Sequence, residues 1–557
     1  MDRSRIYAGD RIAGAPFAGR STVWGARGAA ATAHPLATLA AVDVLREGGS
    51  AVDAAIAANA LLGLVEPTMC GIGGDVFALL WDPGAGAVVG LNGSGRSPRG
   101  LSLEEHRRRA VNGQIWLRGA ASVSVPGAVE GWGRLHRRYG RLHWKRLFEP
   151  AIAAGEDGTP VAQTIAAVWR SNVAALVSDP RVEETANMQA VYAPGGATPA
   201  EGQIYRNPDL ARTYRLIAEG GPEAFYDGEI ATIIAAYFKR IGGWMTREDL
   251  AGHASDWTAP LKTDYRGVEV YGLAPNTQGL TTLQILNILE HFNLGAMGFQ
   301  SAQSLHHQAE AKRLAFEDRA RFFADPAFAE APIDWLNSKT YAAERAAMIR
   351  PDRLLGDLAP GQAPGHGDTT YLCAADSGGM MVSLIQSNFR GMGSGLTPDG
   401  LGFMFQNRGE LFALTDGHPN LYAPGKRPFH TIIPGFAMKD RAPWLAFGVM
   451  GGDMQPQGQA QVIVSLVDYG LGLQEAGDSP RWRHEGSPTP TGVAGRGQGI
   501  LHLESGVPEP TRAGLAALGW TIGGSDAGFG GYQAIQRGQG VYAAASEMRK
   551  DGLALAY

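Results

Sequence analysis

The sequence predicts an α/β protein of four layers, with two β-sheets packed face to face and helices outside them. Helical periodicity dominates residues 144–341, whereas short apolar strands dominate after residue 369. A proline- and glycine-rich run, residues 358–364, separates the two textures. Because a sheet must bury its apolar face, we expect residues 369–557 to complete a sheet that the N-terminal part begins.

The composition is that of a globular protein and excludes several classes of partner. The chain has 557 residues, 45% hydrophobic and 18% charged, with a net charge of −5. This balance predicts neither nucleic acid nor an anionic membrane as partner. The longest uncharged apolar run, residues 54–65, is shorter than the roughly 20 residues that cross a bilayer, and no signal peptide is expected. Cys70 and Cys373 are too few and too far apart for a disulfide framework, so a cytoplasmic protein is expected.

Before residue 369, hydrophobic period and capping residues predict helices with two strand pairs between them. Ser50 or Asp53 is expected to cap the second helix, and Thr246 to cap a later one. The expected helices are 34–47, 52–65, 103–109, 128–139, 147–154, 208–219, 230–241 and 280–292, and the expected strands are 76–81, 87–91 and a pair within 265–273.

After residue 369 the pattern predicts strands joined by tight turns. The clearest is a hairpin of residues 370–375 and 380–386, because Asp376, Ser377, Gly378 and Gly379 between them are typical turn residues. The other expected strands are 402–405, 432–439, 444–450, 533–537 and 540–545, with helices at 457–471 and 510–518.

Thr369 immediately precedes the first strand of that hairpin and follows a segment whose prolines and glycines predict flexibility. Cleavage of the Asp368–Thr369 bond would give Thr369 a free α-amine beside its own hydroxyl. An α-amine with a pKa of roughly 7.7 to 8.0 is a suitable general base at neutral pH. These residues alone leave open the alternative that a Thr-Thr pair opens an ordinary strand.

Three further segments could assist such a nucleophile. Gly451 and Gly452 follow a predicted strand and precede a helix, which leaves main-chain N–H groups available for an oxyanion. Ser394, in a glycine-rich loop, could hydrogen-bond the nucleophile, and His430 and Thr431 precede a strand. Other machinery is missing from the sequence, which has no G-x-S-x-G elbow, no HExxH and no metal-ligand spacing. Cys373 is expected to be a buried strand residue.

From about residue 21 to residue 557 the chain resembles the γ-glutamyltranspeptidase family of N-terminal nucleophile hydrolases. Many collinear stretches carry the resemblance, and together they favour the catalytic interpretation of Thr369. They are residues 45–55, 71–75, 125–129, 221–228, 283–290, 368–370, 425–428, 451–452 and 551–554.

The resemblance implies a precursor that cuts itself before Thr369 by an N-to-O acyl shift. It would yield a large subunit, residues 1–368, and a small one, residues 369–557, which remain associated. Whether two such units form a dimer stays open. The resemblance also implies an acyl-enzyme on Thr369, an oxyanion hole from Gly451 and Gly452, a supporting hydroxyl from Ser387, and no metal or organic cofactor.

Departures from the family pattern concern the substrate. The arginine that holds the glutamyl α-carboxylate in the family aligns with Gly93 or Ser94, leaving only the displaced Arg96. The acidic residue for the α-amine aligns with Leu411, with Glu410 one place away. His430 and Thr431 replace a serine pair. The glutamyl pocket is therefore expected to be altered, as in the divergent branch of the family.

The expected activity is thus a Thr amidohydrolase or acyltransferase acting on a small amide whose acyl part carries a carboxylate. Arg96, Arg408 and His430 are the candidate anion binders. The alternatives are a γ-glutamyl or glutathione hydrolase-transpeptidase, an oxamate-type or cephalosporin-acylase-like amidohydrolase, a lyase, and a non-catalytic relic acting as a binding protein.

Overall fold

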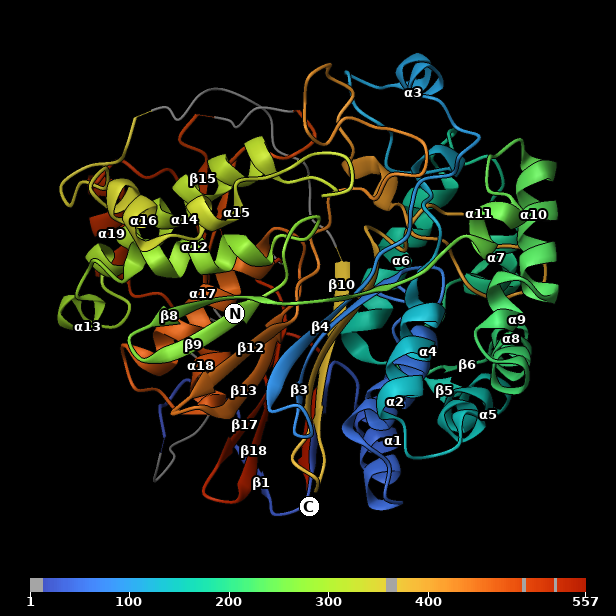
Figure 1. The fold of residues 1–557 in the computed structure, drawn as a ribbon, viewed down its shortest axis with the longest axis horizontal. Helices are drawn as coiled ribbons and strands as arrows, with labels where there is room; N and C mark the ends of the chain where they lie inside the picture. The colour runs from blue at the N-terminus through green and yellow to red at the C-terminus, as the bar shows by residue number, and fades with distance from the viewer. Residues whose placement is uncertain (1–13, 357–367, 493–496, 525–527) are drawn as a thin grey trace.

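The computed structural model describes residues 14–356, 368–492, 497–524 and 528–557. In this part of the structure, two seven-stranded antiparallel sheets lie at the centre of the molecule, and helices pack against their outer faces (Figure 1). The predicted four layers are therefore confirmed. The proline- and glycine-rich run 358–364 lies outside the described residues.

Each sheet takes strands from before and after Thr369. The first sheet has the order β1 (Val23–Gly25), β18 (Val541–Ser546), β17 (Tyr532–Gly538), β13 (Ala442–Val449), β12 (Gly435–Lys439), β9 (Val268–Gly272) and β8 (Leu261–Tyr265). The second has the order β19 (Leu553–Ala556), β2 (Ala29–Thr32), β10 (Asp368–Ala375), β11 (Met381–Phe389), β3 (Asp75–Asp82), β4 (Ala87–Gly93) and β7 (Asp256–Thr258). The late part of the chain thus completes both sheets.

Apolar side chains from alternate strand positions fill the space between the sheets. Phe77, Tyr371, Phe436 and Ile535 are among them, and all are fully buried. Outside the first sheet lie α12 (Gly279–Leu289), α14 (Ala302–Phe322) and α17 (Met454–Val467), and outside the second lie α1 (Pro35–Arg46), α2 (Ala51–Val65) and α4 (Ala128–Tyr139).

Shorter elements surround this body. The helices are α3 (Leu103–Arg109), α5 (Glu149–Asp157), α6 (Gln163–Val177), α7 (Ala186–Tyr192), α8 (Pro208–Gly220), α9 (Glu223–Tyr226), α10 (Glu229–Ile241), α11 (Arg247–Ala251), α13 (Leu294–Met297), α15 (Ile333–Leu336), α16 (Lys339–Ala346), α18 (Leu473–Asp478) and α19 (Glu509–Ala517). The 3₁₀ turns are η2 (Ala120–Ser122), η3 (Trp144–Phe148), η4 (Pro194–Gly196) and η5 (Arg408–Leu411), and the short strands are β5 (Thr159–Pro160), β6 (Ile204–Tyr205), β14 (Trp482–Glu485), β15 (Ile500–Leu503) and β16 (Ile522–Gly523).

The strand predicted at residues 402–405 is wrong. The prediction rested on the apolar side chains of Phe403, Met404 and Phe405. These side chains are buried, but their main chain joins no sheet. The Met404 carbonyl accepts from the Asn388 side chain, and Gly402 has φ +71°, outside the extended region. The run is a buried irregular segment.

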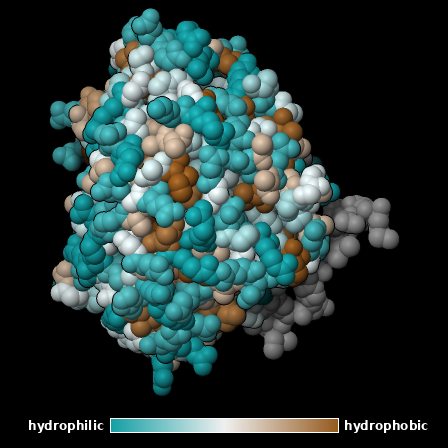
Figure 2. Space-filling model, turned by 90° about the vertical axis from the view of Figure 1, so that its right-hand side faces the viewer, coloured by the Kyte–Doolittle hydropathy of each residue, from teal (hydrophilic) through white to brown (hydrophobic). Residues whose placement is uncertain are grey.

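The face that carries α8 and α10 is mostly hydrophilic, with hydrophobic side chains in small separate groups (Figure 2). Within the described ranges, no helix is both long and apolar enough to cross a membrane.

Candidate active site

Thr369 is the second residue of β10 and only 1% exposed. The pairing of β10 with β11 is irregular here, since the register shifts between Asp368 and Thr370. The Thr369 hydroxyl donates to Ser387 Oγ at 3.5 Å and accepts from Gln455 Nε2 at 3.5 Å. At this irregularity the Thr369 hydroxyl lies between two polar side chains.

Ser387 connects Thr369 to a buried guanidinium. Its hydroxyl oxygen accepts from Arg408 Nη2 at 3.2 Å, and Arg408 Nη1 donates to Thr431 Oγ1 at 2.7 Å. Arg408 is fully buried, with its guanidinium carbon 4.0 Å from the centre of the Phe389 ring. Burial lowers the pKa of Arg408 to about 9, so the side chain stays cationic at neutral pH. The structure therefore brings four of the predicted site residues into one chain of contacts.

The glycine pair lies between β13 and α17. Gly451 and Gly452 have φ of +117° and +57°, which favour glycine. Their carbonyls accept from the amides of Met454 and Gln455, while within the described part of the chain their own N–H groups donate to no other residue. Because Gln455 also reaches the Thr369 hydroxyl, the first turn of α17 links these free amides to the threonine.

Asp75, at the start of β3, is the buried carboxylate of the site. Oδ1 accepts from the amides of Gly95 and Gly127, both at 3.0 Å, and from Gln406 Nε2 at 2.9 Å. Oδ2 lies 2.9 Å from His430 Nε2. Burial raises the pKa of Asp75 to about 6, and burial, with Arg408 and Arg427 nearby, holds the pKa of His430 well below its usual value. His430 Nε2 is therefore already engaged by Asp75, which does not favour the anion-binding role expected for it.

Three other predicted residues have partners of their own. Arg96 donates to Asp325 and to the Gly425 carbonyl, both at 3.4 Å. Glu410 pairs with Arg390 at 3.0 Å, and the Ser394 hydroxyl donates to the Phe405 carbonyl at 3.0 Å. The structure thus gives these side chains contacts other than Thr369.

Sequence reasoning missed Gln455, Gln278 and the role of Asp75 as a hub. Asp75 lies in the stretch 71–75 and Gln455 lies three residues after the stretch 451–452, so their position beside glycines was the available signal. Gln278 had none. The described residues also contain no group of three or more His, Cys, Asp or Glu side chains that could hold a metal ion.

Two packed sheets with helices on both sides, and a buried threonine opening a central strand, define the class of N-terminal nucleophile hydrolases. Within that class the chain belongs to the gamma-glutamyltranspeptidase family, whose model matches residues 37–557. This confirms the family predicted from the sequence.

The chain is similar to several proteins of this family, two of them named as proenzymes. It is 37% identical to the glutathione hydrolase-like YwrD proenzyme of Bacillus subtilis, over 81% of this chain and 83% of that protein. It is 35% identical to the oxamate amidohydrolase proenzyme of Klebsiella pneumoniae, over 82% and 84%. A cephalosporin acylase from Bacillus halodurans has the same fold, with TM-score 0.89, 38% identity and 97% of both chains covered. The chain is therefore an enzyme of the hydrolase and acyltransferase type, as predicted.

Proposed function

We propose that the chain is a precursor that cuts itself between Asp368 and Thr369 and then acts as a Thr amidohydrolase or acyltransferase. The observation that supports this most directly is the chain of contacts from the Thr369 hydroxyl through Ser387 to Arg408. This buried contact chain supports a hydroxyl nucleophile at Thr369 with a cation one side chain away.

The residues fit the steps of acyl transfer. The new α-amine of Thr369 takes the proton of the Thr369 hydroxyl while the hydroxyl oxygen attacks the carbonyl carbon of the substrate amide. The Gly451 and Gly452 amides stabilise the oxyanion, and the amine leaves with a proton from the α-ammonium. Water or an acceptor amine then attacks the acyl-enzyme and releases the acid or a new amide.

Arg408 is the proposed partner of a carboxylate on the acyl group. Only two of its five N–H donors are used by Ser387 and Thr431 in the contacts above, and a guanidinium fork suits a carboxylate. Because Ser387 alone separates Arg408 from Thr369, the substrate carboxylate would lie close to the reacting carbonyl. This favours a short acid, such as an oxalyl or malonyl amide, over a glutaryl or γ-glutamyl amide.

A glutathione hydrolase activity remains the alternative that the family name favours.

We place the enzyme in the cytoplasm, since Cys70 and Cys373 are both free thiols in buried positions.

Self-cleavage is tested by denaturing gel and intact mass. Wild type is expected to give residues 1–368 and 369–557, whereas Thr369→Ala stays whole. Thr370→Ala is the matched control, because its hydroxyl donates to Glu66 instead, and it is expected to be cut. An uncut wild type would contradict the proposal.

Substrate choice is tested with p-nitroanilides of oxalic, malonic, succinic and glutaric acid, beside γ-glutamyl and acetyl p-nitroanilide. For the best carboxylate substrate we expect Arg408→Met to lower kcat/KM at least about 30-fold more than it does for the acetyl compound, which corresponds to the loss of a buried charge pair of about 2 kcal/mol. Arg96→Met is the control and is expected to leave that ratio unchanged. Equal losses on both substrates would refute carboxylate binding by Arg408.

A further inference from the structure

Gln278, just before α12, contacts the carbonyl side of the glycine pair. Its Nε2 donates to the Gly452 carbonyl at 3.0 Å and to the Thr431 carbonyl at 2.6 Å. The side chain is fully buried. The Gln278 amide thus holds two main-chain carbonyls. The Gly452 carbonyl belongs to the glycine pair, and the Thr431 carbonyl belongs to the residue whose hydroxyl accepts from Arg408.

Arg319, in the last third of α14, sets the orientation of that amide. Its Nη1 donates to Gln278 Oε1 and to Asp453 Oδ1, both at 2.6 Å. Because a guanidinium can only donate, Gln278 must present its oxygen to Arg319 and its nitrogen to Gly452 and Thr431. Arg319 also fixes Asp453, the residue that follows the glycine pair.

The cost of this arrangement indicates more than packing. Arg319 is fully buried, its guanidinium carbon lies 3.8 Å from the centre of the Phe316 ring, and Nη2 donates to the Pro488 carbonyl at 3.3 Å. Taking this charge out of water costs free energy, and its carboxylate partner Asp453 is 40% exposed, so the ion pair alone does not account for a buried cation. A cation here is explained better by the fixed direction of its hydrogen bonds.

We propose that Gln278 and Arg319 are positioning residues that aim the Gly451 and Gly452 amides at the developing oxyanion. This inference rests on the proposed function, because it assumes that those amides bind the oxyanion. Gln278 and Arg319 belong to the proposed large subunit and the glycine pair to the small one, so each piece would supply part of the oxyanion site.

The decisive variant is Gln278→Glu. The new carboxylate keeps the contact with Arg319 but cannot donate to the Gly452 and Thr431 carbonyls. The companion variants are Arg319→Met, which frees the Gln278 amide to turn, and Arg319→Lys, which keeps a donor and a charge.

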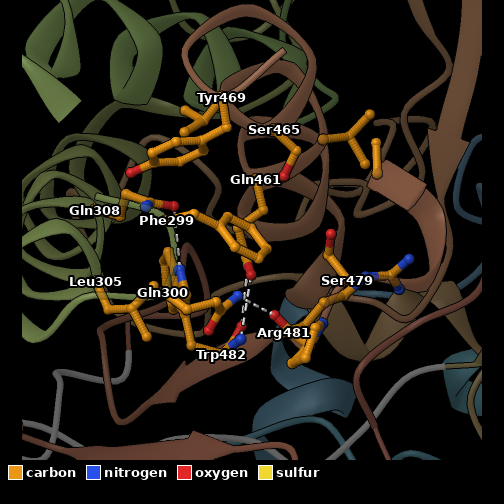
Figure 3. A pocket seen from close by; sticks show the side chains of 14 residues that line it. Phe299, Gln300, Leu305, Gln308, Gln461, Ser465, Tyr469, Ser479, Arg481 and Trp482 are labelled. Atoms are coloured by element: carbon orange, nitrogen blue, oxygen red, sulfur yellow. Dashed lines mark hydrogen bonds between the residues drawn. The ribbon is translucent and has the colours of Figure 1, made fainter. Parts of the chain in front are cut away.

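The matched control is Gln461→Leu. Gln461, on α17, is another buried glutamine whose amide bridges main-chain groups, the N–H and carbonyl of Trp482 at 3.1 and 3.0 Å. It lines a cavity of about 20 Å³ between α14 and α17 (Figure 3), and neither Gly451 nor Gly452 is among the lining residues. Removing it tests the loss of a buried amide without a change at Gly452.

The measurement is kcat and KM per cleaved molecule, on the best p-nitroanilide, with melting temperature alongside. We expect Gln278→Glu and Arg319→Met to lower kcat about 10- to 100-fold, below the loss of a whole oxyanion donor, with KM within about threefold. Arg319→Lys should recover part of the loss. Gln461→Leu should lower the melting temperature and leave kcat within about twofold.

Two results would overturn the inference and leave the proposed function standing. One is a Gln278→Glu enzyme whose kcat matches that of Gln461→Leu. The other is failure of every Gln278 and Arg319 variant to cut itself, since the defect would then lie in maturation. If wild type instead turns over no faster than Thr369→Ala, the proposed function itself fails.

Discussion

At the scale of single residues, Asp75 explains why the site needs both parts of the chain. Its carboxylate accepts from Gly95 and Gly127, which precede Thr369, and from Gln406 and His430, which follow it. An ionised carboxylate offers several acceptor positions, so four donors can share it. Asp75 therefore holds the loops around Arg408 in a single arrangement.

Glu66 gives a prediction for the pH dependence of stability. It is buried and accepts from the Thr370 hydroxyl at 2.8 Å, and burial raises its pKa to about 7. The folded protein therefore holds a proton that the unfolded chain loses as pH rises above about 4.5. The stability from this group is present at low pH and is lost as pH rises to about 7.

Replacing Glu66 with Gln should remove this dependence. Between pH 5 and pH 8 we expect wild type to lose up to about 3 kcal/mol of unfolding free energy relative to Glu66→Gln. The measurement is urea unfolding of both proteins in the uncut Thr369→Ala background. Parallel pH curves would show that Glu66 does not titrate in this range.

A candidate site residue could be predicted from the sequence when its own short motif marked it. Thr369, Gly451 and Gly452 stand in short motifs at strand ends, where turn chemistry is visible. Gln278 and Arg319 meet only because α12 and α14 pack together, 41 positions apart in sequence. Nothing in the sequence around Gln278, just before α12, or around Arg319, within α14, marks it as a site residue.

At the scale of elements, α2 shows how one carboxylate can fix several segments. The sequence predicted Ser50 or Asp53 as its cap, and the structure has Ser50 as the N-cap with Asp53 as its partner in a reciprocal capping box. Asp53 Oδ2 also accepts from the amides of Arg141 and Leu142, at 2.8 and 3.1 Å. The start of α2 is thereby tied to the segment that follows α4.

This arrangement predicts unequal effects of two cap substitutions. Ser50→Ala should cost about 1 kcal/mol, as for a usual N-cap. Asp53→Ala should cost at least about twice as much, because it also leaves the amides of Arg141 and Leu142 without their partner. Urea midpoints in the uncut Thr369→Ala background compare them, and equal costs would contradict the wider role of Asp53.

Elements whose ends are marked in the sequence were predicted well. The predicted range 103–109 agrees with α3, whose N-cap Ser102 accepts from the Glu105 amide. The predicted range 128–139 agrees with α4, which has Glu130 in its first turn and basic residues in its last turn, although Gly127 gives it no side-chain cap. Residues 402–405 offered only apolar side chains. Burial alone does not show whether the main chain pairs with a strand or with side chains.

At the scale of the whole molecule, each sheet contains strands from both parts of the chain. In the second sheet β2, β10, β11 and β3 lie side by side, and β10 and β11 come from after the proposed cleavage point. Cutting one peptide bond would remove none of these pairings. The two pieces are therefore expected to stay together by burial and hydrogen bonds alone.

Size-exclusion chromatography of the cut protein tests this. Under native conditions both pieces should elute together, at the volume of uncut Thr369→Ala, and should separate only in denaturant. Separation in plain buffer would mean that the sheets do not hold the pieces.

The central place of β10 has a further consequence for the lifetime of the mature enzyme. In the uncut precursor, β10 takes its place between β2 and β11 while all three strands belong to one chain. After cleavage that path no longer exists, because two separate molecules would have to meet and interleave their strands. The proposed cut form would then be maintained by how slowly it unfolds, and we expect a molecule that opens once not to refold.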